Sequence, residues 1–177
     1  MKIPKLFFKK LILGIVLIFI SALGSLALKD MVDAKTPESS LPILEVNCAF
    51  STPLISGDGS PEKYLVRANY SWRFITGVKE GLNLAPGDLA MLPLTVTPST
   101  PILFHFSREP EKVVVSRAQG SYPSAESFIQ YEGDALAGEI LTPASPGTYI
   151  YRIEVQFDRG SILYYLSLRV DDLSATG

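Results

Sequence analysis

One segment constrains this chain more than any other: residues 11–28 read LILGIVLIFISALGSLAL, without a charge or a proline. As an α-helix this segment would be roughly 27 Å long at ~1.5 Å per residue, close to the ~30 Å hydrocarbon core of a bilayer. It has no polar face, which disfavours a buried helix of a soluble domain. The sequence therefore predicts one N-terminal apolar helix that crosses a membrane or directs the chain to one.

The charges around this segment predict its orientation. No acidic residue occurs before Asp30, whereas four of the 16 basic residues lie in the first ten positions. These are Lys2, Lys5, Lys9 and Lys10. Because cytoplasmic flanks carry an excess of Lys and Arg, we expect a cytoplasmic N-terminus and an extracytoplasmic remainder. Residues 29–177 contain the other 12 basic residues and all 18 acidic residues, so this part of the chain has a net charge of −6. A negative net charge disfavours nucleic acid as a partner.

Two fates of the apolar segment stay open. It is either retained as the single-pass anchor of a cell-membrane protein, or it is the core of a signal peptide. The small residues of Ser25-Leu26-Ala27 would allow cleavage after Ala27, which would release a secreted protein. Leu28 extends the apolar run beyond that site, so retention is the favoured interpretation.

The remainder divides by composition into a linker, one domain and a tail. Residues 29–42 are polar and contain two prolines, which is typical of a juxtamembrane linker. Residues 43–173 carry the strand patterns of an extracytoplasmic domain, and 174–177 form a tail. The chain has one cysteine, so the domain has no internal disulfide bond.

The clearest isolated strand is predicted over residues 64–74. Its sequence, YLVRANYSWRF, alternates with a period of two, as in a strand that is buried on one face. Strict alternation places five residues on the inner face: Val66, Ala68, Tyr70, Trp72 and Phe74. The outward face then holds Leu65, Arg67, Asn69, Ser71 and Arg73.

The C-terminal part predicts a β-hairpin over residues 148–171. TYIYRIEVQF and SILYYLSLRV both alternate with a period of two, and the short turn Asp158-Arg159-Gly160-Ser161 joins them. Gly160 lies in this turn and supplies the residue that tolerates a positive φ.

Weaker patterns predict further strands, and turn signals separate them. The candidates are 43–50, 90–97, 102–107, 112–117 and 138–142. Residues 118–136 are predicted as a long loop or as a segment with a short edge strand. Many short strands with one apolar face predict an all-β fold, an antiparallel β-sandwich with Greek-key connections, after the N-terminal helix.

The hairpin carries a resemblance to a known family. The letters PGTY, which include Gly147 and Tyr149, precede the penultimate strand and look like the tyrosine corner of immunoglobulin-like domains. Trp72, inward by alternation, resembles the core Trp of that superfold. The pattern over 43–172 is similar to bacterial cell-envelope immunoglobulin-like domains. The resemblance implies that the Tyr149 hydroxyl bonds back to the backbone, and it implies an adhesive, structural or ligand-binding role without catalytic residues.

Residues that could carry chemistry are few. His105 is the only histidine and falls on the outward face of its predicted strand, with no nucleophile motif beside it. Cys48 falls on an inward face, which favours a buried thiol over an intermolecular disulfide. No acidic loop has the spacing of a calcium site, so neither a metal nor another cofactor is expected.

The candidate interaction face lies on the C-terminal hairpin. Aromatic and arginine side chains are enriched at protein interfaces. The residues expected to form this face are Tyr165, Leu163, Arg169 and Arg152. The sequence thus predicts a non-enzymatic, membrane-anchored accessory module that binds another envelope protein. The alternative is a secreted domain that binds a small ligand or a cell-wall glycan.

Overall fold

The computed structural model divides the chain into two compact units. The first comprises residues 1–41 and 73–79, and the second comprises 42–72 and 80–177. The structure describes residues 5–48, 53–56, 64–89, 91–121, 123–131, 135–137 and 140–171. Outside these residues lie Lys2, the predicted strand residues 49–50, 90 and 138–139, and the tail 174–177.

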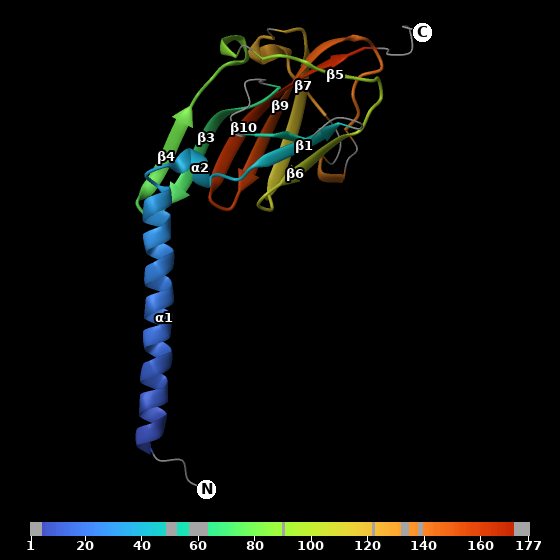
Figure 1. Cartoon of the computed structure of the whole chain (residues 1–177). Coiled ribbons are helices and arrows are strands. Elements are labelled where there is room, and N and C mark those ends of the chain that lie inside the picture. Colours follow the sequence, from blue (N-terminus) through green and yellow to red (C-terminus); the bar gives the residue numbers. More distant parts are fainter. Residues whose placement is uncertain are drawn as a thin grey trace. The chain divides into compact units, whose positions relative to one another are not determined.

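The first unit contains the long helix α1 (Lys5–Asp33) and the short helix α2 (Pro37–Ser40). Figure 1 shows α1 as one uninterrupted helix. No proline lies between its first residue and Asp33, so the helix runs five residues beyond the apolar segment. Within the span Lys9–Asp33, an 18-residue window has a mean hydropathy of 2.7, and none of that window is buried. This helix is long and apolar enough to span a membrane or to act as a signal anchor.

The second unit contains two sheets, of which only residues 73–79, at the turn of the β3–β4 hairpin, belong to the first unit. The small sheet has the strand order β2-β1-β6 and the large sheet the order β4-β3-β10-β9-β7-β8, with β5 pairing β10 in parallel. The small sheet contains β1 (Leu44–Cys48), β2 (Leu54–Ile55) and β6 (Ile102–Phe106). The large sheet contains β3 (Leu65–Phe74), β4 (Gly77–Leu82), β5 (Leu94–Val96), β7 (Lys112–Gln119), β8 (Ile129–Gln130), β9 (Gly147–Phe157) and β10 (Gly160–Val170). The 3-10 helices are η1 (Pro86–Asp88), η2 (Ala125–Ser127) and η3 (Ala135–Ala137).

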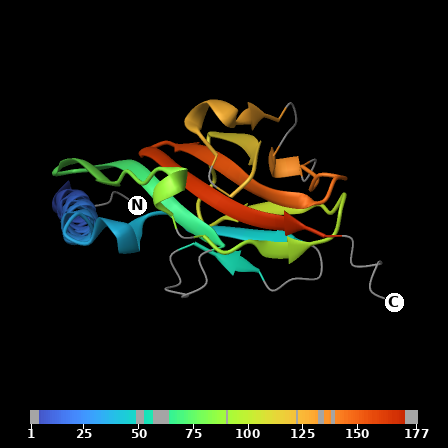
Figure 2. The ribbon, with the colours of Figure 1, turned by 90° about the horizontal axis from the view of Figure 1, so that it is seen from above.

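The core lies between the two sheets. Figure 2 shows the small sheet against one face of the large sheet, with the segment of η2 and β8 over the other face. Phe157 of β9 joins the layers, because its ring meets Trp72 edge-on at 5.7 Å and Phe106 of the small sheet at 6.1 Å. The prediction of a mostly β domain with two antiparallel sheets after one apolar helix is therefore confirmed.

The predicted C-terminal hairpin is confirmed as β9 and β10, which pair over their whole length. Gly160 begins β10 with a φ of +155°, and a Cβ there would lie 2.0 Å from the carbonyl oxygen of Ser71 on β3. Two independent reasons therefore require glycine at this position: its backbone conformation and the close approach of the neighbouring strand β3.

The residues named for the tyrosine corner take the expected geometry. The Tyr149 hydroxyl donates a hydrogen bond to the backbone carbonyl of Ser145 at 3.0 Å. Gly147 has a φ of +149° and Trp72 is only 2% exposed. The inward position of Trp72 and the backward bond of Tyr149 are thus confirmed as local features.

The predicted faces of β3 are wrong at its N-terminal half. The register with β10 shifts between Leu163 and Tyr164, so that Ala68 forms a β-bulge with no partner of its own. A bulge adds one residue and reverses the alternation before it. Arg67 therefore lies opposite the inward Tyr164, and the two side chains both donate to the Pro42 carbonyl, at 3.4 and 3.0 Å.

Other segments differ from the expectation in extent. β4 was not predicted, and residues 29–33 and 37–40 of the predicted linker are helical. Of the predicted strand 138–142, the described part forms only one isolated bridge, between Leu141 and Pro101. The segment 118–136 contains the short edge strand β8, which confirms that alternative.

Candidate functional site

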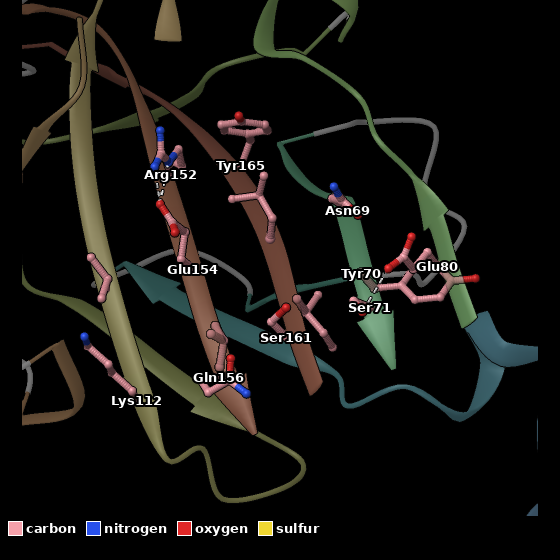
Figure 3. Close-up of a pocket in the computed structure, with 14 residues that line it drawn as sticks. Asn69, Tyr70, Ser71, Glu80, Lys112, Arg152, Glu154, Gln156, Ser161 and Tyr165 are labelled. Atoms are coloured by element: carbon pink, nitrogen blue, oxygen red, sulfur yellow. Dashed lines mark hydrogen bonds and ion pairs between the residues drawn. The ribbon is translucent and has the colours of Figure 1, made fainter. Parts of the chain in front are cut away.

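A groove of about 600 Å³ lies across the outer face of the large sheet. Figure 3 shows that its labelled side chains come from neighbouring strands: Arg152, Glu154 and Gln156 from β9, with others from β3, β7 and β10. Glu80 of β4 closes one side. The groove and all of its lining residues belong to the second unit.

The strand register arranges this face into three rows, because directly paired residues share one face of a sheet. The first row holds Lys112, Gln156, Ser161 and Ser71. The second row holds Val114, Glu154, Leu163 and Asn69. The third row holds Ser116, Arg152, Tyr165 and Val66. All four residues of the first row are polar, whereas the third row includes the apolar side chain of Val66 and the aromatic ring of Tyr165.

An ion pair lies on β9, toward the β7 side of the groove. Arg152 Nε donates to Glu154 Oε1 at 2.7 Å, and both residues belong to β9. The guanidinium also lies over the ring of Phe128, 5.6 Å from its centroid. These contacts hold the Arg152 side chain along the sheet and neutralise the Glu154 carboxylate.

Tyr165 lies at the apolar end of the groove, where other side chains cover it. This side chain is on the outer face, as predicted, but it is only 5% exposed because it packs in a cluster of mostly apolar side chains. Phe128, from the segment that folds over the sheet, lies 6.1 Å from its ring centroid. Burial raises the pKa of Tyr165, against the opposing effect of the Arg152 charge. The expectation that Tyr165 presents an exposed aromatic surface is therefore wrong.

The structure brings together three of the four residues of the predicted interaction face. Arg152, Leu163 and Tyr165 all line the groove. Arg169 lies on β10 beyond it, where its guanidinium pairs with Asp171 at 2.8 Å. A binding role for this set stays a prediction.

Sequence reasoning missed two charges at the ends of the groove. Lys112 of β7 is exposed and makes no ion pair with any residue that the structure describes. Glu80 of β4 is exposed and accepts a hydrogen bond from the Ser71 hydroxyl at 3.4 Å. The outward polar residues of β9 were visible as alternation. The pairing that adds Lys112 and Glu80 to the same face is non-local and has no signal in the sequence.

The other candidate residues lie away from the groove. His105 is exposed on β6, opposite Glu45 of the small sheet. Cys48 is fully buried on β1, and burial raises the pKa of its thiol to about 12. The described ranges contain no group of three or more His, Cys, Asp or Glu residues that could hold a metal ion.

Comparisons with known proteins return no relatives. No protein-family model, curated protein or solved structure matches this chain. The functional assignment therefore depends on the geometry of the groove and on the apolar helix.

Proposed function

We propose that this protein is a non-enzymatic accessory module of the cell envelope, anchored by α1 with its sandwich outside the membrane. The groove of the large sheet would bind an extended segment of another envelope protein. The length and hydropathy of α1 support the anchor, and the four basic residues before the apolar segment support the orientation. Anchoring would raise the effective concentration of the sandwich near a membrane-bound partner.

The observation that carries the proposal is the row structure of the outer face. The groove crosses five strands, β4, β3, β10, β9 and β7, and adjacent strands are about 4.8 Å apart, so it is about 19 Å wide. An extended polypeptide advances about 3.3 Å per residue, so the groove accommodates about six residues. Amide, hydroxyl and charged groups on Asn69, Ser71 and Gln156 are suited to the polar backbone and side chains of such a segment.

The composition of the groove favours a polypeptide over a small ligand or a glycan. Sites for small molecules are mostly apolar and enclose their ligand, whereas this groove is partly open and its lining is about as polar as it is apolar. Its two tyrosines, Tyr70 and Tyr165, are 4% and 5% exposed, so neither offers a ring face to a sugar. The lining contains neither His105 nor Cys48, so the groove has no imidazole base and no thiol nucleophile, which agrees with a binding role.

The charges at the two ends predict the chemistry of the partner. Lys112 lies on the β7 side and Glu80 on the β4 side, while the charges of the Arg152–Glu154 pair on β9 neutralise each other. A complementary segment would carry an acidic residue toward β7 and a basic residue toward β4.

The immunoglobulin-like assignment is also part of this proposal. It is supported by the backward hydrogen bond of Tyr149, the buried Trp72 and the paired C-terminal hairpin. Such domains commonly serve adhesion and recognition, which agrees with a groove that binds protein.

Photo-crosslinking in cells tests the proposed function. A photoreactive amino acid replaces Gln156, which is exposed in the first row, and a matched control carries it at His105, exposed on the small sheet. We expect one discrete protein adduct in the membrane fraction from position 156 and none from position 105. Equal labelling from both positions, or no adduct from 156, would overturn the groove as a protein-binding site. Retention of the protein on isolated cell wall would then favour the glycan alternative.

A further inference from the structure

The tip of the β3–β4 hairpin is bonded to the end of α1 within the first unit. The backbone N–H of Ile75 donates to Asp30 Oδ2 at 2.5 Å, and Asp30 is only 8% exposed. Asp30 follows the last residue of the apolar segment, Leu28, by two positions. At ~1.5 Å per residue, the hairpin tip is thus bonded to the helix at a level about 3 Å beyond the apolar segment.

Two exposed apolar side chains lie on this tip. Ile75 is 64% exposed and Val78 is 57% exposed. Between them the chain turns at Gly77, whose φ is +128°. Tight turns in water are dominated by Gly, Pro, Asn, Asp and Ser, so two exposed branched apolar residues beside the turn are unusual. Together they form a small exposed apolar patch at the tip.

The exposed charges of the same unit are mainly positive. Beyond the apolar segment the exposed basic residues are Lys29, Lys35, Arg73 and Lys79, against the exposed acid Glu38 and the half-buried acid Asp33. The carboxylate of Asp30 is buried. Basic side chains next to an apolar patch bind lipid phosphates with their charged ends while their stems remain among the headgroups.

We propose that the hairpin tip is a second membrane contact of this protein, beside its own anchor. Ile75 and Val78 enter the boundary between headgroups and acyl chains, to the ~5–10 Å depth that peripheral apolar side chains reach. Arg73 and Lys79 flank them at the level of the phosphates. This inference rests on the anchoring role of α1 in the proposed function, because the bond to Asp30 sets the height of the tip.

Depth-dependent fluorescence quenching tests the contact on the full-length protein. The protein is reconstituted into vesicles of three parts phosphatidylcholine to one part phosphatidylglycerol. A single environment-sensitive NBD label is attached at Ile75→Cys, Phe19→Cys or Ile129→Cys, in a Cys48→Ala background. Phe19 lies in the apolar segment, and Ile129 is an exposed apolar residue of the second unit, 77% exposed.

We expect lipids spin-labelled near the headgroup to quench the label at position 75, with a blue-shifted emission. Lipids spin-labelled deep in the acyl chain should quench position 19, and only aqueous iodide should quench position 129. A label at 75 that behaves like the one at 129, while 19 is quenched by deep lipids, would overturn the membrane contact alone. Loss of quenching at 19 would instead overturn the anchor, and with it both proposals.

A second measurement compares two proteins that both carry the label at Gly77→Cys. One retains Ile75 and Val78, and the other is the double variant Ile75→Asn with Val78→Asn. We expect shallow quenching at 77 to fall at least severalfold when both apolar side chains are replaced. Unchanged quenching at 77 in the double variant would show that these side chains do not hold the tip in lipid.

Discussion

The two faces of the large sheet are made by alternate residues of the same strands, and they differ in almost every property. On the inner face, Ile162, Tyr164 and Phe157 are no more than 1% exposed and pack between the sheets. On the outer face, Glu154 and Gln156 are exposed and line an open groove. The comparison indicates that the inner face contributes most of the packing, whereas the open part of the outer face is where we propose that recognition takes place. Substitutions should therefore separate the two properties.

The largest expected effect is on the inner face. Trp72→Ala should lower the free energy of unfolding by about 4 kcal/mol, since it removes a large buried ring and leaves a cavity beside Phe157. The measurement is urea denaturation of the full chain in micelles, followed by β-sheet circular dichroism. The neighbouring outer-face variant Ser71→Ala should change the value by less than about 0.5 kcal/mol. Similar losses of unfolding free energy for both variants would show that the inner face does not contribute more to stability than the outer face.

A backbone substitution at the hairpin turn should come next. Gly160→Ala combines a positive φ with a contact of 2.0 Å to the Ser71 carbonyl, so we expect a loss of about 3 kcal/mol. Gly77→Ala is the matched control, since its φ is +128° and no atom lies within 4 Å of the added Cβ. It should lose only about 1 kcal/mol. Equal losses in the same denaturation experiment would mean that the close approach of β3 to β10 is not needed.

On the outer face we expect an effect on binding without an effect on stability. Lys112→Glu reverses the charge at the β7 end and should reduce the adduct yield from position 156 about tenfold, which corresponds to ~1.4 kcal/mol. Arg108→Glu, a charge reversal outside the groove, is the control and should leave the yield unchanged. The proposal of a charge-complementary segment would be wrong if both variants behaved alike.

The smallest effect concerns the buried thiol and alkaline pH. Burial raises the pKa of Cys48 from 9.0 to about 12, so the folded protein keeps the proton that the unfolded chain releases. Below pH 9 the thiol does not change the stability with pH, and its full contribution to the folded state is present. Between pH 9 and about 12 this contribution is lost, at a rate of at most about 1.4 kcal/mol per pH unit. Cys48→Ala should show a shallower decline in denaturation midpoints between pH 9 and 10. Identical slopes would mean that the thiol is accessible to water.

The sequence predicted the elements whose signal is local. A period of two identified β9, β10 and β3, whereas weaker apolar patterns between turn signals identified β1, β6 and β7. β4 escaped prediction because all but one of its residues are exposed, so no alternation marks it. The bulge at Ala68 and the cover that Phe128 forms over Tyr165 depend on pairing and packing between distant segments.

The same distinction applies to the candidate site. Arg152 and Leu163 could be placed on an outward face from the hairpin alone. Lys112, Asn69 and Glu80 reach the groove only through the register of β7, β3 and β4, which no local pattern specifies. The apolar helix was predictable from composition, whereas its bond to the hairpin tip was not.

The most direct test of the groove is to map where two crosslinkers on different strands attach to a partner. Gln156 of β9 and Asn69 of β3 line the same groove from strands on either side of β10. We predict that photoreactive residues at these two positions attach to one partner within a single segment of about six residues, as the width of the groove requires. Attachment to separate surfaces, to unrelated proteins or to none would contradict the binding of one extended segment.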